Sequence, residues 1–327
     1  MPANLTPQYR AAEDRYRAAA TAEEKIAALR EMLAVIPKHK GTEKLQADLK
    51  QRLSKLQNQS QRAGAHRTTF DHVPREGAGQ VTLVGPPNAG KSSLLAALTR
   101  AQPEIGPYPF TTHVPQPGMM AFEDVQIQLV DTPPVAREHT PPWLPGLVRS
   151  ADLALVALDL AEPSLLEQAE FMFERLAMSR VILMSPGAPA PEDPIVAAVT
   201  ALVVGNKADL PDARVGEALL GELLGGRLPL AVVSALTGSG LPELRRQVFT
   251  LLDVVRVYAK EPGKPADRER PFVLARGSTV ADLASCIHRD LLVNLRFARV
   301  WGAHTFAGQT VHRDHPLTDG DVVEIHA

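Results

Sequence analysis

Residues 85–92 combine the residue types that bind a chain of phosphates. They read Gly-Pro-Pro-Asn-Ala-Gly-Lys-Ser and lie directly after an apolar run and directly before a helical pattern. Glycines let successive backbone N–H groups surround phosphate oxygens, Lys91 would reach the outer two phosphates, and the Ser92 hydroxyl would ligate Mg²⁺. The spacing therefore predicts a P-loop, against the alternative of a plain tight turn between a strand and a helix.

Asp209 can select the base of a nucleotide, because it ends the polar segment Asn-Lys-Ala-Asp at residues 206–209. A fixed carboxylate accepts two hydrogen bonds from N1–H and the amino group of guanine, and adenine offers no such pair of donors. Asn206 would tie loops together, the stem of Lys207 would cover the purine face, and the N–H of Ala235 would donate to guanine O6. Losing paired buried hydrogen bonds costs several kcal/mol, so the segment predicts guanine specificity, although alone it could equally be a polar turn.

Short apolar runs alternate with helical patterns through the middle of the chain, and several of them lead into these polar loops. Parallel strands buried on both faces have this pattern, and doubly wound sheets bind ligands at the loops that follow their strands. The runs are residues 81–84, 125–130, 153–158, 181–184, 201–204 and 230–233. The run at 125–130 contains two glutamines and is expected nearer a sheet edge. The pattern predicts an α/β fold.

The first 64 residues predict a hairpin of two helices. One apolar stripe ends at Pro37, and a second starts after Thr42, a residue type that caps helix N-termini. From Lys38 to Arg67 there are eight Lys or Arg residues against two acids. A contact with RNA or the ribosome and a solvated helix face offset by acids elsewhere both fit this surplus. The stripes are Ile26, Leu29, Met32, Leu33 and Ile36, then Leu45, Leu49, Leu53 and Leu56.

The end of the chain predicts a small mixed domain. Strand-like runs at 272–275, 298–301 and 322–325 surround one helix, residues 280–288, opened by Ser278. A stretch rich in proline and charge precedes them. The expected division is a hairpin at 1–64, a linker at 65–79, a nucleotide-binding domain at 80–258, a linker at 259–270 and a last domain at 271–327.

Composition sets wider limits on function. The 327 residues are 45% hydrophobic and 22% charged with a net charge of −2, so overall charge predicts no partner. The single cysteine, Cys286, excludes an internal disulfide and is expected to fill a core position in a reducing compartment. No signal-like start or uncharged run of about 20 residues is present, which predicts a cytoplasmic, soluble protein. Five of the ten histidines lie from His288 onward at spacings that suit no metal site.

Taken together, the nucleotide motifs and Tyr-Pro-Phe-Thr-Thr at residues 108–112 resemble the Obg and developmentally regulated (DRG) GTP-binding proteins. Residues 36–43 are similar to the DRG helical hairpin, and residues 255–260 to the segment that leads into the last DRG domain. Residues 297–302 and 319–325 resemble the DRG type of TGS domain, a ubiquitin-like β-grasp fold. The resemblance implies a Ras-like G domain between a helical hairpin and a TGS domain. It also indicates a bacterial DRG-like member, since the glycine-rich N-terminal domain of Obg is absent.

The resemblance assigns roles to individual residues. Thr112 would ligate Mg²⁺ when a γ-phosphate is present, with Thr111 as the fallback, and Asp131 would hold a water of the magnesium shell. Asn88 would either help to ligate K⁺ or simply close the turn. The catalytic set is Lys91, Thr112 and Asp131. The nucleotide-binding set is Gly85, Pro86, Pro87, Asn88, Ala89, Gly90, Lys91, Ser92, Ser93, Phe110, Thr111, Thr112, Asp131, Asn206, Lys207, Asp209, Ser234, Ala235 and Leu236.

The chain departs from the family pattern Asp-x-Pro-Gly at Pro134. The family glycine donates its N–H to the γ-phosphate, and proline has no N–H and a fixed φ. Either the second switch couples weakly to nucleotide state, or the Val135 amide replaces the donor; a stiff loop through Pro141, Pro142 and Pro145 is the structural alternative. Val135 cannot orient water, so hydrolysis is expected to be slow and to need a monovalent cation or a partner group. Glu138 and His139 could assist or be merely solvated.

Three hypotheses remain for function. The first is a molecular switch, a slow GTPase whose nucleotide state alters how the hairpin and the TGS domain engage a ribosome, another RNA-containing partner or a protein. The second is a scaffold that holds GTP or GDP with little or no hydrolysis, motivated by Pro134 and Val135. The third is ATP specificity, against which Asp209 argues.

Overall fold

The computed structural model describes residues 15, 22–35, 49, 73–99, 114–137 and 140–327, which form parts of two compact units, residues 1–69 and 70–327. In the first unit, α2 (Ala22–Val35) covers the first of the two expected helices. Its Leu29 and Met32 are buried, which agrees with the apolar stripe. The expected second helix and most of the basic segment lie outside the described residues.

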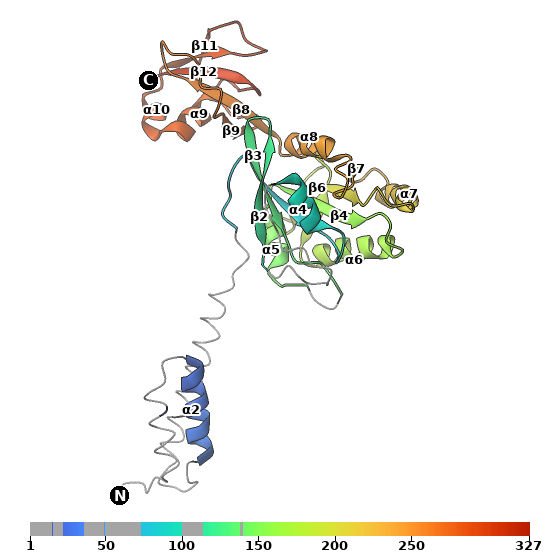
Figure 1. Cartoon of the computed structure of the whole chain (residues 1–327). Coiled ribbons are helices and arrows are strands. Elements are labelled where there is room, and N and C mark those ends of the chain that lie inside the picture. The colour runs from blue at the N-terminus through green and yellow to red at the C-terminus, as the bar shows by residue number, and fades with distance from the viewer. Residues whose placement is uncertain (1–14, 16–21, 36–48, 50–72, 100–113, 138–139) are drawn as a thin grey trace, which may run out of the picture. The chain divides into compact units, whose positions relative to one another are not determined.

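The second unit contains a seven-stranded sheet, mostly parallel, with the order β2-β3-β1-β4-β6-β5 (Figure 1). The antiparallel β2 forms one edge, and β5 and β7 pair with different parts of β6. The strands are β1 (Gln80–Val84), β2 (Gln116–Phe122), β3 (Val125–Asp131), β4 (Leu153–Asp159), β5 (Val181–Met184), β6 (Ala197–Asn206) and β7 (Leu230–Val232). The α/β fold expected from the apolar runs is confirmed.

In the described part of the chain, helices cover both faces of this sheet (Figure 1). On one face, α4 (Lys91–Leu98) and α8 (Leu241–Leu251) bury their leucines against β1, β3 and β4. On the other face lie α5 (Leu144–Ser150), α6 (Leu165–Met178) and α7 (Ala213–Leu224). Burial on both faces explains why the central strands are continuously apolar.

Residues 125–130 were expected nearer a sheet edge, and β3 lies next to the edge strand β2, which the apolar runs did not predict. Of its two glutamines, Gln126 is exposed and Gln128 is buried. The Gln128 side chain accepts a hydrogen bond of 2.8 Å from Gln80 and donates one of 3.0 Å to the carbonyl of Pro74. Partners of this kind allow a buried strand to carry a polar side chain.

The C-terminal domain is a five-stranded sheet of order β11-β10-β12-β8-β9. Helices α9 (Val280–Ile287) and α10 (Arg289–Asn294) follow β9, and α9 packs Val280 and Leu283 into the apolar core beneath the sheet. The strands are β8 (Val254–Lys260), β9 (Phe272–Ala275), β10 (Phe297–Trp301), β11 (Gln309–Val311) and β12 (Asp321–His326). The sequence analysis ended the nucleotide-binding domain at residue 258, whereas β8 pairs with β12 and β9 in this second sheet.

Two further predictions in this domain are wrong. The helix cap is Thr279 and not Ser278, since Thr279 and Asp282 form a capping box in which each side chain bonds the other residue's backbone N–H. Cys286 is exposed and does not fill the core, because it lies on the solvent side of α9. Among the described residues, no helix is long and apolar enough to span a bilayer.

Candidate nucleotide-binding site

The predicted P-loop continues directly from β1 and turns into α4 at Lys91. Asn88 has a φ of 59° and Gly90 a φ of 84°, two left-handed conformations that turn the chain. A Cβ on Gly85 would lie 2.2 Å from the carbonyl oxygen of Ala157, and one on Gly90 would lie 2.3 Å from Nδ2 of Asn206. Only glycine fits such close approaches, so these glycines set the path of the loop.

Lys91 is buried inside this loop, with 7% of its surface exposed. Its Nζ donates to the carbonyl oxygens of Gly85, at 3.2 Å, and Pro86, at 2.9 Å. Burial lowers the pKa of Lys91 to about 8, and the charge of Asp131 opposes this shift. The ammonium group is thus held by the loop itself, where an outer phosphate would replace its carbonyl partners.

Asp131 and Ser92 meet at the carboxyl end of β3. Asp131 is fully buried and accepts a hydrogen bond from the Ser92 hydroxyl. Thr132 donates its Oγ1 hydrogen bond, 2.7 Å, to the carbonyl of Leu83 and so fixes the backbone that follows β3. A carboxylate beside a hydroxyl, next to the P-loop lysine, is a set of oxygen ligands that suits Mg²⁺.

The segment after Asp131 packs against the P-loop. Pro133, Pro134 and Val135 are all buried, and the Val135 side chain lies in the core with α5 and α6. The Val135 N–H donates to the carbonyl oxygen of Gly85 at 3.0 Å. The amide that could replace the missing glycine donor is therefore engaged by the P-loop in this structure.

Asn206 connects the predicted phosphate and base loops. Its Nδ2 donates to the carbonyl of Ala89 at 3.0 Å, and its Oδ1 accepts from the N–H of Ala235 at 3.0 Å. It is 1% exposed, so both bonds are shielded from water. The sequence analysis expected the Ala235 N–H to face guanine O6; here the same N–H faces Asn206. The loop-tying role of Asn206 is visible in the geometry.

The carboxylate of Asp209, which is predicted to read the base, is also held in place. Ser234 is fully buried, and its hydroxyl donates to Oδ1 of Asp209. The same Ser234 oxygen accepts from the N–H of Thr237 at 3.1 Å, which closes the loop after β7. A carboxylate fixed in this way has its second oxygen available to define a rigid acceptor edge.

Sequence reasoning missed Asp159, the last residue of β4. Its carboxylate forms an ion pair of 2.6 Å with Nζ of Lys207, which is itself in a left-handed conformation with a φ of 63°. The ion pair sets the direction of the Lys207 stem that was expected to cover the purine. Its position could have indicated this role, because Asp159 is the last residue of a parallel strand, as are Asp131 and Asn206, and the carboxyl ends of these strands lie together.

The remaining predicted residues divide into two groups. Phe110, Thr111 and Thr112 lie outside the described residues, as do Glu138 and His139. Ser93 lies in the first turn of α4, and Leu236 is 86% exposed beside the base-reading loop. Among the described residues, no group of three or more His, Cys, Asp or Glu side chains could hold a metal ion by itself.

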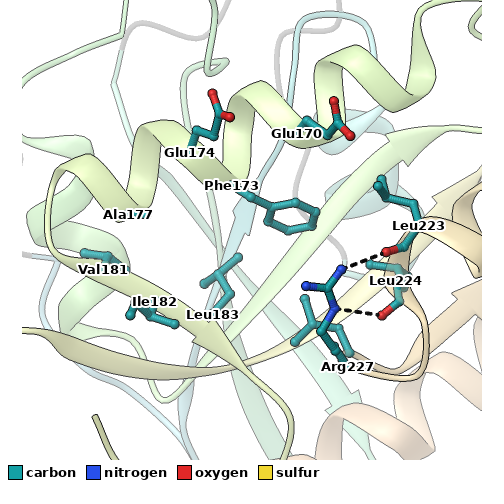
Figure 2. A pocket seen from close by; sticks show the side chains of 11 residues that line it. Glu170, Phe173, Glu174, Ala177, Val181, Ile182, Leu183, Leu223, Leu224 and Arg227 are labelled. Atoms are coloured by element: carbon teal, nitrogen blue, oxygen red, sulfur yellow. Dashed lines mark hydrogen bonds between the residues drawn. The ribbon is translucent and has the colours of Figure 1, made fainter. Parts of the chain in front are cut away.

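One hollow lies beside the P-loop and another lies away from it. The first, of about 210 Å³, borders Pro86, Pro87 and Val135, and Arg137 also lines it, with its guanidinium 5.4 Å from the centre of the Phe171 ring. Figure 2 shows the other, of about 590 Å³, between α6, β5 and the end of α7. Its Arg227 donates to the carbonyl oxygens of Leu223 and Leu224. β5 pairs with the N-terminal part of β6, so this second hollow lies away from the loops at the strand ends.

Two family models match the chain. Residues 80–184 match a model described as 50S ribosome-binding GTPase, and residues 255–327 match the TGS domain. Fold, P-loop and guanine-type segment together with these matches define a GTP-binding P-loop protein with a C-terminal TGS domain.

Comparison with known proteins indicates which GTP-binding proteins the chain resembles. An uncharacterised GTP-binding protein of Methanocaldococcus jannaschii is 29% identical over 93% of this chain and 92% of its own length. Developmentally-regulated G-protein 1 of Arabidopsis thaliana is 27% identical over 92% of this chain and 90% of its own. GTPase Obg of Desulforudis audaxviator is 34% identical over 59% of this chain and 45% of its own. The chain is therefore a GTP-binding P-loop GTPase with a TGS domain, similar to the Obg and DRG proteins.

A solved structure supports the fold. The crystal structure of a GTP-binding protein from Pyrococcus horikoshii matches with a TM-score of 0.50 at 19% identity, covering 76% of this chain and 99% of that one.

Proposed function

We propose that the protein is a slow GTPase that works as a molecular switch. The observation that carries this proposal is Asn206, whose side chain bonds both the P-loop at Ala89 and the base-reading loop at Ala235. One buried amide thus holds the phosphate site and the guanine site in a fixed relation, as a bound guanine nucleotide requires. The residues assigned to the nucleotide remain predictions, and their arrangement supports them.

The oxygen ligands next to Lys91 fit Mg²⁺. Ser92 and Asp131 are in mutual contact at the end of β3. Thr112 would join them from residues 110–114, which the family resemblance makes the first switch. A bound Mg²⁺ would supply charge to the β- and γ-phosphate oxygens. Asn88, exposed and left-handed at the rim of the loop, would be the protein ligand of K⁺.

Hydrolysis requires water to attack the γ-phosphorus while the bond to the β-phosphate oxygen breaks, releasing GDP and phosphate. Lys91 would stabilise the charge that develops on the phosphate oxygens. Val135 is buried in the core and has no group that could orient the attacking water. Without such a group the reaction is expected to be slow unless K⁺ or a partner supplies the missing charge.

A scaffold with little hydrolysis is the second candidate. The Val135 N–H bonds Gly85 and Pro134 has no N–H, so the segment after Asp131 offers neither of these amides to a γ-phosphate in this arrangement. If that arrangement persists with GTP, the protein binds both nucleotides alike and does not switch.

The partner follows from family likeness and charge. The matching family model is described as a 50S ribosome-binding GTPase, and the basic residues between Lys38 and Arg67 suit a polyanion. We therefore propose a ribosome or RNA partner in the cytoplasm, with the TGS domain available to a protein partner. A bacterial source also stays a proposal, since the two relatives named above that match more than nine-tenths of the chain are archaeal and eukaryotic.

Changing Asp209 to Asn tests guanine recognition. An amide presents a donor where the carboxylate presents only acceptors, so Asp209→Asn is expected to weaken GDP binding by about 100-fold, equivalent to a buried charged hydrogen-bond pair. Xanthosine diphosphate has a carbonyl in place of the guanine amino group and should bind the variant better than GDP. Nucleotide titrations measure both. ATP or ADP displacing GDP from the unaltered protein at comparable concentration would overturn guanine specificity.

Single-turnover hydrolysis separates the switch from the scaffold. GTP is incubated with excess protein in K⁺ and in Na⁺, with and without ribosomes, and phosphate release is followed. The switch predicts turnover above the uncatalysed rate, raised by K⁺ or by ribosomes. A rate equal to background in every condition, with GTP tightly bound, would support the scaffold instead.

A further inference from the structure

The turn between β2 and β3 carries two adjacent acids, Glu123 and Asp124. Glu123 is in a left-handed conformation with a φ of 48°, and Phe122 and Val125 pair on either side of the turn. The strands run from this turn to the nucleotide loops, because Gln116 at the start of β2 pairs with Asp131 at the end of β3. The acids therefore occupy the end of the hairpin that is remote from the predicted phosphates.

Arg256 of the TGS domain contacts both acids. Its Nη1 donates to Oδ1 of Asp124 at 2.9 Å and also to Glu123. The Arg256 side chain is 15% exposed and that of Asp124 is 22% exposed, so this pair is shielded far more than an ordinary surface ion pair. Shielding strengthens charge pairing, since the effective dielectric is lower than in water.

Asp319 holds Arg256 in the direction this contact needs. It lies in the turn before β12 and accepts from Nε at 3.0 Å, Nη2 at 2.7 Å and the backbone N–H of Arg256 at 2.7 Å. Arg256 lowers the pKa of Asp319 through these bonds, so the carboxylate stays charged. The two edges of the planar guanidinium therefore have different partners. Nε and Nη2 bond Asp319 inside the TGS domain, and Nη1 bonds the acids of the hairpin turn.

Two further contacts surround the ion pair. Tyr258, two residues along β8, donates its hydroxyl to Asp124. The Arg256 guanidinium lies 5.0 Å from the centre of the Phe249 ring on α8, and Phe249 stacks on Phe122 at 4.8 Å. The stacked pair of Phe122 and Phe249 thus lies against the Arg256 guanidinium. Residues of β2, α8 and β8 all take part in the contact.

The hairpin links this contact to the predicted magnesium site. β3 runs seven residues from Val125 to Asp131, which corresponds to roughly 23 Å of strand. β2 leads back toward the first switch, beginning at Gln116. A strand pair joined by backbone hydrogen bonds moves as one body, so a displacement at its nucleotide end reaches its turn.

Resting on the function proposed above, we propose that Arg256 is a positioning residue that couples the TGS domain to the nucleotide. It fastens the TGS domain to the turn of the hairpin that joins the two switch segments. A partner that binds the TGS domain and the nucleotide at the other end of β2 and β3 then change each other's affinity. Such coupling is reciprocal, because binding free energies are linked.

Hydrogen exchange on the full chain tests this coupling. Amide exchange is measured with GDP and with a non-hydrolysable GTP analogue, each at saturation. The expected result is a difference of about fivefold between the two nucleotides in β8 and in residues 319–321, in the range typical of allosteric coupling. Exchange in β10 reports whether the TGS fold itself is intact.

Two variants break the contact from opposite sides. Arg256→Gln removes the charge from the TGS domain, and Asp124→Asn removes it from the hairpin while leaving the pair of Arg256 with Asp319. Both are expected to reduce the nucleotide-dependent difference to less than about twofold, with β10 exchange unchanged. Arg246→Gln is the matched control: its pair with Glu243 is exposed and confined to α8. It should keep the full difference.

Three outcomes would overturn the coupling. The difference could persist in Asp124→Asn, it could disappear equally in Arg246→Gln, or the unaltered protein could bind both nucleotides and show none. In each case the proposed binding of guanine nucleotide would stand, since it is measured separately, and hydrolysis is tested by the single-turnover experiment. Failure of the unaltered protein to bind either nucleotide would remove the proposed function and this inference together.

Discussion

Backbone N–H groups are the main phosphate ligands of a P-loop protein. Pro134 has no N–H, and it stands where the resembling family has a glycine that donates one. The structure shows how the neighbouring amide is used instead, since Val135 bonds the carbonyl of Gly85. That bond ties the segment after β3 to the start of the P-loop. Whether the protein distinguishes GTP from GDP therefore depends on whether residue 134 or 135 can offer an N–H to the γ-phosphate.

Restoring this donor should strengthen binding of a GTP analogue relative to GDP. A hydrogen bond to a charged phosphate contributes about 1.5–3 kcal/mol, so Pro134→Gly is expected to raise the affinity ratio by roughly tenfold or more. Nucleotide titrations give the ratio. Pro142→Gly, an exposed position in the same loop, is the control for added flexibility. An unchanged ratio in Pro134→Gly would mean that the amide never faces the γ-phosphate.

Residues whose chemistry is local could be placed near one another from their motifs, and their roles toward a nucleotide stay predictions. Asp131 and Asn206 end β3 and β6, and Lys91 and Ser92 begin α4 after the loop that follows β1. Asp159 was missed because it has no motif around it and its ion-pair partner, Lys207, lies 48 positions later in the chain. Cys286 was misplaced because apolar neighbours in sequence do not show which side of α9 faces solvent.

Helix α7 packs closely on the loop that follows β4. A Cβ on Gly216 would lie 1.9 Å from the carbonyl oxygen of Leu160, and the N–H of Leu160 donates to the carbonyl of Asn206 at 3.0 Å. Gly216 is thus the point at which the helix approaches the base-reading segment most directly. The same helix contains Gly221, which is exposed and has open space around it.

These two glycines predict opposite effects on stability. Gly216→Ala should lower the free energy of unfolding by about 1–3 kcal/mol through overpacking, and should weaken GDP binding by displacing Leu160. Gly221→Ala should raise it by about 0.5–1 kcal/mol, because alanine favours helix and meets no clash. Urea unfolding of both variants provides the comparison. An equal change in the free energy of unfolding in both variants would show that helix propensity alone determines their stability.

Elements were predictable where apolar runs are continuous. β1, β4 and β5 begin and end within one residue of the predicted runs. β2 was not found, since Gln116–Phe122 contains a proline and a glycine, residues that only an edge strand tolerates well. β3 was expected nearer a sheet edge and lies next to that edge strand. The pairing of β8 with β12 and β9 was not predicted, because sequence shows a strand's pattern and not its pairing partner.

At the scale of the whole molecule, the G domain and the TGS domain meet through charged and aromatic side chains far apart in sequence. Arg256 and Asp124 are separated by 132 positions, so no local pattern could have paired them. Burial raises the pKa of Asp124, but hydrogen bonds from Tyr258 and Arg256 outweigh it and leave the pKa below its ordinary value. The hydrogen bond to Asp124, and then burial, raise the pKa of Tyr258.

The phenol of Tyr258 should therefore ionise at a higher pH than a free tyrosine, whose pKa is about 10. A raised folded pKa means that its stabilising effect is present below that pH and is lost as pH rises through the folded value. Ultraviolet titration of the unaltered protein minus that of Tyr258→Phe isolates this group among the four tyrosines. Asp124→Asn should lower the pKa toward the ordinary value; a normal pKa in the unaltered protein would contradict the contact.

The exposed position of Cys286 has a practical consequence. It is the one thiol in the 327 residues, and it is exposed on α9 of the TGS domain. A fluorophore or spin label attached there reports on the TGS domain alone, with no cysteine to be removed elsewhere. The native chain is thus already suited to following that domain spectroscopically while nucleotides and ribosomes are exchanged.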